Sequence, residues 1–490
     1  MKNPIIVATI CIYVVIMATI SFLGSKKSKN MSDFTVGGRN AGAWMSAFSY
    51  GTAYFSAVMF IGYAGGTGWQ YGIWGVLPGI GNAIIGSLFA WLVLARRTRS
   101  VTREKSITSM PQLFDKNFGS RGLKLFSAIV IFIFLVPYSA SVYKGLTSVC
   151  SVLLDLPEMV CMIIIAAASA IIVIVGGYIA ALRADFIQGL VMLFGVIALV
   201  FAVLCSKDGI SENMQNIVQK TKDLNLSSAQ HLGLWATVLM TSFGTWGLPQ
   251  MIHKYYGIRD DREVKRGTVI STLFALVVAG GGYFIGSLSR LFYDNLDSFP
   301  NNSTDYLIPN MLNDANISSI LVGITLVLLI AASVSTLSSI TITASSTFTL
   351  DIVQDRFIKD KTKDMSVFTK AVCFAFVLIS FLIAWLGEGT PILDMMSYSW
   401  GIISGSFLAP YAVSLYWKKI TKAGAWASVL GGFITALPPL VAKLLGSSAK
   451  LGALGEIHKL GPHFACAAMI ISFVLLFVVS LITQKKVVKE

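Results

Sequence analysis

Long apolar stretches recur along almost the whole chain and are separated by short polar segments. Many of them have about 20 residues, the length that an α-helix needs to cross the hydrocarbon core of a bilayer. Because no water reaches that core, each crossing segment must satisfy its own backbone hydrogen bonds, which favours helices. We therefore predict an all-α membrane protein with thirteen transmembrane helices, at residues 4–23, 44–63, 72–95, 124–150, 158–178, 183–205, 232–256, 267–290, 317–350, 367–387, 392–416, 422–445 and 462–483.

The composition agrees with this pattern. Of the 490 residues, 55% are hydrophobic and only 13% are charged, whereas charged residues make up about 25% of a typical soluble protein. Neither a Pro-rich linker nor a low-complexity tail divides the chain. Residues 1–490 are therefore interpreted as a single polytopic membrane domain.

The formal net charge of +14 could indicate nucleic-acid binding, but the placement of the basic residues favours another explanation. If the first loop is cytoplasmic, most Lys and Arg lie on or beside the cytoplasmic side, in stretches such as 26–29, 96–105 and 485–490. This positive-inside asymmetry predicts an N-terminus outside, a C-terminus in the cytoplasm and no nucleic-acid partner. The apolar run at 4–23 precedes its basic residues, so it is interpreted as an uncleaved helix and not as a signal peptide.

The sequence contains no pattern that is typical of an enzyme. The six cysteines are scattered through apolar segments without CxxC pairing, and the four histidines show no HExxH spacing. The cysteines are interpreted as small hydrophobic residues. No nucleophile and base pair stands out within the spans, so we expect no enzymatic activity.

Two of the predicted helices contain residues that interrupt a helix. The second span has Gly51 among small and polar residues, and the seventh has Gly244, Gly247 and Pro249 within a few positions. Proline lacks an amide hydrogen and clashes with the preceding turn, so an unbroken helix through residue 249 is not expected. Each interrupted helix opens a run of five spans, and such matched breaks indicate a midplane site in an inverted-repeat transporter. The alternative is that the glycines allow close helix packing.

A third unusual feature is the stretch 330–346, which has nine hydroxyl side chains in seventeen positions. Ser335, Ser338 and Ser339 share one helix face, and Thr336 lies beside them. Hydroxyl and carbonyl oxygens are neutral hard ligands that suit a small hard cation. The alternative is a helix-packing seam of small residues.

Few ionisable side chains were identified within the predicted spans. Asp185, just inside the sixth span, is a first-turn acid that suits the helix dipole, or else a ligand for a second cation or a proton relay. Lys144 can extend to the membrane surface or meet an anionic substrate. Asp394, at the start of the eleventh span, is interpreted as a helix cap.

These features together resemble the sodium:solute symporter family, and they are most similar to its sodium/proline symporter branch. Each motif is short, but their combination over nearly the whole chain is specific. The residues that carry the resemblance are GGRNAGAWMSAFSYGTAYFSA (37–57), GLPQ (247–250), ASVSTLSSITITASSTFTLDI (332–352), MMSYSWGIISGSFLAP (395–410) and LYWKKITKAGAWAS (415–428).

The resemblance implies a LeuT-type fold. Its five-plus-five inverted repeat would cover about 44–205 and 232–416, with one extra N-terminal and two extra C-terminal helices. The implied activity is sodium-coupled import of a small organic solute across the cell membrane by alternating access. The resemblance favours an amino acid or an organic acid as the solute. Sodium would be the co-transported ion. A sodium-responsive sensor or channel is the alternative, although the sequence has no appended signalling domain.

The resemblance also implies site residues. The first sodium ion would be bound by Thr52, Phe55, Ala332, Ser335 and Thr336. A possible second sodium ion would be bound by Asp185, Ser338 and Ser339. The substrate would contact Tyr54, Ser56, Trp74, Tyr138, Ser141, Thr245, Trp246, Tyr398 and Trp400, with Trp74 included only as an aromatic residue in the third span.

One position departs from the pattern, because proline symporters carry an acid where this chain has Tyr54. The substrate is therefore left open among amino acids, pantothenate-like acids, other monocarboxylates and sugars. The sodium stoichiometry, the ability of a proton to replace sodium, the role of Lys144 and the oligomeric state are also left open by the sequence.

Overall fold

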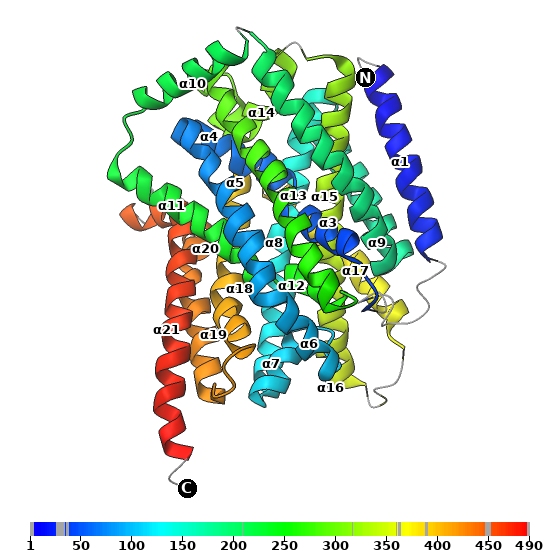
Figure 1. Ribbon diagram of the computed structural model, residues 1–490, viewed down its shortest axis with the longest axis vertical. Helices are drawn as coiled ribbons and strands as arrows, with labels where there is room; N and C mark the ends of the chain where they lie inside the picture. Colours follow the sequence, from blue (N-terminus) through cyan, green and yellow to red (C-terminus); the bar gives the residue numbers. More distant parts are fainter. Residues whose placement is uncertain are drawn as a thin grey trace.

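The computed structural model describes residues 4–25, 35, 39–207, 209–315, 317–358, 360, 364–387, 391–445 and 452–487. The described residues form a bundle of helices with no β-strand, and Ala41 and Ile258 form an isolated β-bridge. The two ends of the chain lie at opposite ends of the bundle (Figure 1). The basic stretch at 26–29 lies outside the described residues.

The first part of the chain runs from the N-terminal helix to a short helix at one end of the bundle (Figure 1). Its elements are α1 Pro4–Ser25, α3 Ala43–Tyr54, η2 Val58–Tyr63, α4 Ala64–Tyr71, η3 Gly72–Val76, α5 Leu77–Gly81, η4 Asn82–Phe89, η5 Trp91–Ala95, α6 Arg96–Glu104, α7 Met110–Phe118, α8 Arg121–Leu154, α9 Glu158–Cys205 and α10 Ile210–Asp223.

The second part begins with another interrupted helix and ends at the C-terminal helix. Its elements are α11 Ser228–Phe243, η6 Gly244–Trp246, α12 Pro249–Tyr256, α13 Asp261–Leu288, η7 Ser289–Leu291, η8 Pro300–Asn302, η9 Thr304–Tyr306, α14 Leu307–Asp314, α15 Ser319–Thr347, η10 Phe348–Gln354, α16 Asp355–Phe357, α17 Ser366–Leu386, α18 Ile392–Ser414, α19 Lys422–Ala436, α20 Pro438–Leu444, η11 Gly452–Leu460 and α21 Gly461–Val487.

Several helices begin where a short polar side chain can accept a hydrogen bond from a free backbone N–H. Ser120 caps α8, Asp260 caps α13 and Ser318 caps α15. Ser227 and Gln230 form a reciprocal capping box at α11. These caps satisfy donors that the first turn of a helix leaves without a partner.

Within the described residues, eight helices are long and apolar enough to cross a membrane. The all-helical membrane fold is thus confirmed, whereas the number thirteen stays a prediction. One of the eight, Val58–Glu104, contains the predicted span 72–95 and the last residues of the predicted span 44–63, and these two parts are joined through Gly72, where φ is +59°. Other predicted spans are divided into short helices by the breaks near residues 55 and 248.

The sequence predicted two separate spans at 158–178 and 183–205, and the break between them was wrong. Helical hydrogen bonding continues through α9 from Glu158 to Cys205. The polar residues at 183–185 indicated that a helix ends there at the membrane surface. In the structure Asp185 is buried and accepts a hydrogen bond from Ser335, so the helix can continue past it inside the protein.

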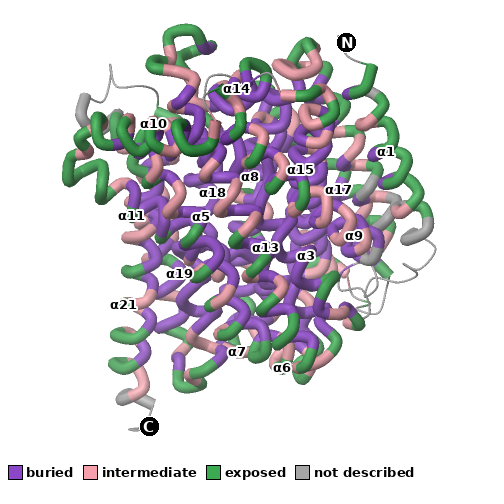
Figure 2. The backbone as a smooth tube through the Cα atoms, turned by 45° about the horizontal axis from the view of Figure 1, so that its top comes forward, coloured by how far each residue is buried: buried purple, intermediate pink, exposed green. Residues whose placement is uncertain are grey.

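The surface and interior differ in the way expected of a membrane protein. Large apolar side chains point outward, including Phe194 (65% exposed) on α9 and Leu273 (60% exposed) on α13. Hydroxyl groups lie inside, and every residue from 331 to 347 on α15 is buried. Figure 2 shows this buried centre surrounded by more exposed helices. Apolar exposure on this scale is unusual for a soluble protein and suits contact with lipid.

The centre of the bundle is organised around α15, which packs against α1, α3, α8, α9, α12 and α17. At another crossing, α4 and α13 approach so closely that their backbones touch at glycines. A Cβ atom at Gly286 would lie 2.0 Å from the carbonyl oxygen of Ala64. Small residues at such crossings allow helices in a membrane to pack backbone to backbone.

The close approach of α4 and α13 predicts that Gly286→Ala destabilises the protein. The added methyl group would push against backbone, and overpacking of this kind typically costs about 1–3 kcal/mol. The thermal unfolding temperature in detergent should fall. Gly280→Ala is the matched control on the same helix, because a Cβ atom there meets nothing within 4 Å. Equal unfolding temperatures for the two variants would contradict the packing argument.

Candidate functional site

The first helix break lies between α3 and η2. Phe55 has extended backbone angles (φ −103°, ψ 98°), which end α3 at Tyr54. The amide of Ala57 donates to Ser333 Oγ at 3.3 Å and not to the carbonyl of Ala53, its partner in a regular α-helix. Ser56 Oγ accepts from the amide of Val58 at 3.2 Å and so caps the next helical segment. The break therefore releases backbone carbonyl groups inside the bundle.

The second break lies between α11 and α12, as the proline predicted. The 3₁₀ turn η6 ends at Trp246, Leu248 is extended (φ −81°, ψ 120°), and Pro249 begins α12. Proline suits a first helical position because it has no amide hydrogen that would need a partner. The residues after the break therefore belong to a new helix with its own orientation.

Oxygen atoms from α3 and α15 meet at the first break. Thr336 Oγ1 lies 3.1 Å from the carbonyl oxygen of Thr52, 3.3 Å from that of Ala53 and 3.0 Å from that of Ala332. Ser335 Oγ lies 2.9 Å from Thr52 Oγ1. We call these residues the neutral oxygen cluster. It brings together four of the five residues predicted for the first sodium ion and adds Ala53, while Phe55 lies at the break itself.

A carboxylate lies directly beside the neutral oxygen cluster. Asp185 on α9 is 1% exposed, and its Oδ1 accepts from Ser335 Oγ at 2.6 Å. Its Oδ2 accepts from Ser49 Oγ and from Lys254 Nζ, which is 3.3 Å away. Lys254 also donates to Ser339 Oγ at 2.8 Å. Asp185 therefore has serine hydroxyls and an ammonium group as partners.

The residues predicted for a second sodium ion are only partly brought together by direct contacts. Asp185 and Ser339 share Lys254 as a partner. The hydroxyl of Ser338 donates to the carbonyl of Val334 at 2.7 Å, one turn earlier on its own helix. Such back-bonding is common for serine in membrane helices.

Aromatic side chains close around the two breaks. Tyr54 donates to the carbonyl of Thr241 at 2.6 Å, and its ring lies 6.2 Å from that of Trp400. Trp400 also meets Tyr138 edge to face at 5.7 Å. Within the described residues, Tyr138 Oη and Trp400 Nε1 are buried without a hydrogen-bond partner. We call Tyr54, Tyr138 and Trp400 the aromatic cluster.

Other predicted substrate residues have polar groups that bond mainly to the backbone. Ser141 Oγ donates to the carbonyl of Tyr138 at 2.7 Å, and Thr245 Oγ1 donates to that of Ser242 at 2.9 Å. Trp246 Nε1 donates to the carbonyl of Ile85 at 3.0 Å. Ser56 serves as the cap described above. The hydrogen-bonding groups of these side chains are therefore already used within the protein.

Two predicted substrate residues lie away from the aromatic cluster. Trp74 is 51% exposed on η3, next to the turn at Gly72, so it does not line an enclosed site. Tyr398 Oη donates to the carbonyl of His458 at 3.3 Å, which directs it toward η11. Trp74 was predicted as a substrate residue only because it is aromatic and lies in the third span, and these two properties do not determine which way its side chain faces.

Two buried polar residues of α12 were not predicted from the sequence. Lys254 is 4% exposed and lies within the predicted span 232–256. An ionisable residue inside a membrane span is by itself a signal for function. Gln250 is 0% exposed, and neither of its amide atoms has a partner among the described residues. The signal for both is a polar side chain within the predicted span 232–256, after the helix break at Pro249.

A cavity of about 500 Å³ lies on the side of the bundle that carries η9 and α14. Its lining includes Lys144, Glu158, Asp305 and Tyr306. Lys144 Nζ donates to the carbonyl of Gly387 at 2.8 Å. Burial raises the pKa of Asp305, while the amide of Ile392 and the charge of Lys144 act in the opposite direction. Lys144 therefore lies at a cavity that could admit solutes, and not at the aromatic cluster.

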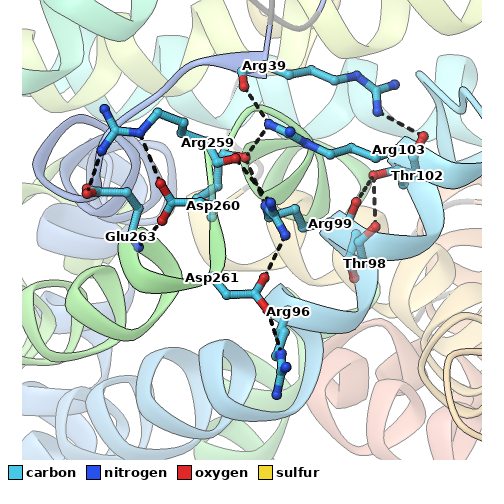
Figure 3. A network of polar contacts seen from close by, with 11 residues as sticks. Arg39, Arg96, Thr98, Arg99, Thr102, Arg103, Arg259, Asp260, Asp261 and Glu263 are labelled. Carbon is cyan, nitrogen blue, oxygen red and sulfur yellow. Dashed lines mark hydrogen bonds and ion pairs between the residues drawn. The ribbon is translucent and has the colours of Figure 1, made fainter.

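At the other end of the bundle, charged residues join α6 to the connection between α12 and α13 (Figure 3). Arg99 Nη1 pairs with Asp261 at 2.6 Å, and Arg96 pairs with the same carboxylate at 2.8 Å. Arg103 Nη2 donates to the carbonyls of Arg39 at 2.6 Å and Ile258 at 3.0 Å. We call this end, with residues 96–105 and 257–263, the basic end.

The same network holds the start of α3. Glu263 Oε2 accepts from the amide of Ala43 at 2.6 Å, and Arg259 pairs with Glu263 Oε1 at 2.9 Å. The amide of Glu263 and the guanidinium of Arg259 both lower the pKa of Asp260, because they stabilise its carboxylate form. The contacts of the basic end therefore join α6, the start of α3 and the start of α13.

The network predicts that Arg103→Gln loosens the basic end. The variant loses charged hydrogen bonds to two carbonyls, so backbone amides in residues 39–46 and 257–263 should exchange hydrogen faster. We expect about 5- to 30-fold, the factor that corresponds to one or two kcal/mol. Hydrogen exchange followed by mass spectrometry measures it. Lys220→Gln, which removes contacts to Arg290 and Asp294 elsewhere, should leave these segments unchanged. Equal exchange in both variants would contradict the role of Arg103.

The family model for sodium:solute symporters matches residues 34–432 of this chain. Similar proteins include the high-affinity proline transporter PutP of Bacillus subtilis, which is 25% identical over 474 residues, covering 96% of each chain. The sodium/proline symporter of Salmonella typhimurium is 25% identical over 452 residues, covering 89% of this chain and 88% of the relative.

Solved structures are similar over almost the same length. The substrate-bound outward-open state of a Na⁺-coupled sialic acid symporter has a TM-score of 0.78, with 17% identity and 98% of both chains covered. The transporter MHP1 of the nucleobase-cation-symport-1 family, in a closed conformation, has a TM-score of 0.57, with 14% identity, covering 93% of this chain and 96% of that one. At these identities the likeness concerns the fold. The repeat boundaries at 44–205 and 232–416 stay a prediction.

Proposed function

Because this chain belongs to the sodium:solute symporter family, we propose that it imports a small organic solute bearing a carboxylate by alternating access. The chain is an integral membrane protein, and sodium is its co-transported ion. The solute is an amino acid or another organic acid. The basic end faces the cytoplasm in this proposal, with the N-terminus outside, in agreement with the positive-inside pattern.

The observation that carries the proposal is the neutral oxygen cluster at the first break. Thr336 joins the carbonyl groups of Thr52 and Ala53 on α3 to that of Ala332 on α15. Carbonyl and hydroxyl oxygens without a net charge suit a small hard cation that must be released in every cycle. Phe55 and Ser335 complete the proposed sodium site. Each sodium ion that enters contributes about 2.3 kcal/mol per 100 mV of membrane potential.

The position of this cluster provides a way to couple sodium to the conformation. Its ligands come from two helices, α3 and α15, so sodium stabilises the arrangement in which they lie together. A ligand shifts a conformational equilibrium only through its different affinity for the two states. Opening of the basic end would separate α3 from α15 and weaken the site, which releases sodium to the cytoplasm.

The aromatic cluster supports a carboxylate-bearing solute. Tyr138 Oη and Trp400 Nε1 are buried donors without partners in the described part of the chain, and such groups are costly unless a ligand accepts from them. Gln250 offers a further donor and acceptor near the second break. Tyr54 stands where proline symporters carry an acid, so the solute here is expected to differ from proline. The aromatic rings provide apolar contact for its carbon skeleton.

The proposed function predicts sodium-driven accumulation in proteoliposomes. Radiolabelled amino acids, pantothenate, other monocarboxylates, sialic acid and a sugar would be offered with an inward sodium gradient. At least one carboxylate-bearing solute should accumulate about tenfold over a potassium control, since a tenfold sodium gradient is equivalent to about 1.4 kcal/mol. Uptake that equilibrates without concentrating, with or without sodium, would contradict symport and favour a channel.

The sodium site predicts a specific effect of Thr336→Val combined with Ser335→Ala. The double variant loses two hydroxyl ligands, so the sodium concentration for half-maximal uptake should rise at least about tenfold, as expected for about 1.4 kcal/mol. Thr325→Val is the matched control, because Thr325 lies on the same helix and its hydroxyl donates to the carbonyl of Leu321. Unaltered sodium dependence in the double variant would remove these residues from the proposed site.

A further inference from the structure

Lys254 is a buried cation with a full set of partners. It lies on α12, six residues after the second break, with 4% of its side chain exposed. An ammonium group has three N–H donors. The three acceptors within reach are Ser49 Oγ at 2.8 Å, Ser339 Oγ at 2.8 Å and Asp185 Oδ2 at 3.3 Å. The ammonium group therefore lies where oxygen atoms from α3, α9 and α15 converge.

These oxygen atoms are of the kinds that would bind a second sodium ion. A carboxylate and two hydroxyl groups form an oxygen site of the sort that hard cations prefer. Asp185 and Ser339 also belong to the predicted second sodium site. The ammonium group carries the same charge as sodium and already compensates the carboxylate. A sodium ion bound to Asp185 Oδ2 would lie beside this ammonium and be repelled by it.

We propose that Lys254 is a tethered cation that takes the place of a second sodium ion, so that the protein binds one sodium ion and not two. This inference rests on the proposed sodium-coupled function. It replaces the predicted second sodium site with a lysine supplied by α12. Sodium is then confined to the neutral oxygen cluster, where Ser335 links the two positions through its contacts with Asp185 and Thr52.

Binding of ²²Na⁺ to the purified full-length protein tests the proposal without knowledge of the solute. The unsubstituted protein should saturate at about one sodium ion per chain, because Lys254 compensates Asp185. Lys254→Met frees the carboxylate and its hydroxyl neighbours, so binding should rise to about two ions per chain. Combining Lys254→Met with Asp185→Asn removes both charges and should return the count to about one.

The outcomes separate this inference from the proposed function. Two sodium ions on the unsubstituted protein would overturn the role of Lys254, and this measurement needs no variant. One ion on both the unsubstituted protein and folded Lys254→Met would overturn it as well. Absence of saturable sodium binding to the folded, unsubstituted protein would overturn the sodium-coupled function on which the inference rests.

Thermal unfolding provides a second readout, because Lys254→Met leaves a buried carboxylate unpaired when sodium is replaced by potassium. The unfolding temperature of this variant should be low in potassium and should rise with sodium by more than that of the unsubstituted protein, since a ligand that binds the folded state stabilises it. Lys443→Met, at a partly exposed lysine on α20, is the control and should behave like the unsubstituted protein. An equal sodium-induced rise in all three proteins would overturn the proposal.

Discussion

The structure depends on one constraint: a backbone carbonyl that a broken helix releases inside a membrane must find its partner within the protein. At the first break, the hydroxyl of Thr336 meets the carbonyls of Thr52 and Ala53, and Ser333 accepts from the amide of Ala57. Both partners come from α15. The break in one helix and the hydroxyl-rich stretch in the other are therefore one structural feature, because neither would be stable in lipid without the other.

The same contacts link the neutral oxygen cluster to the buried charges. An ionised carboxylate can only accept hydrogen bonds, so the hydroxyl of Ser335 donates to Asp185 and presents a lone pair toward Thr52. Asp185 in turn is compensated by Lys254. The internal pair of Lys254 and Asp185 then stays neutral in the proposed cycle, so the charge that crosses the membrane comes from sodium and from the solute.

The sequence predicted the features that follow from local chemistry. Pro249 predicted the second break, and helical periodicity placed Ser335 on a hydroxyl-bearing face of its helix with Thr336 beside it. Lys254 was not predicted, because a lysine near the end of a span ordinarily extends to the membrane surface; only the new helix that begins at Pro249 directs it inward. Trp74 was predicted to contact the substrate but is half-exposed. Its orientation depends on the backbone at Gly72, and the type of residue 74 alone does not determine that orientation.

The two kinds of ion pair in this protein differ in how easily they can break. The pair between Arg96 and Asp261 at the basic end is largely exposed, and exposed pairs contribute roughly 0.2–1 kcal/mol each. Separating the buried pair of Lys254 and Asp185 would leave an uncompensated charge, which typically costs about 3–5 kcal/mol. In the proposed transport cycle, we therefore expect opening of the basic end to begin with the exposed pairs and with the start of α3. Movement of α12 away from α9 and α15 requires water or a cation to reach Asp185 at the same time.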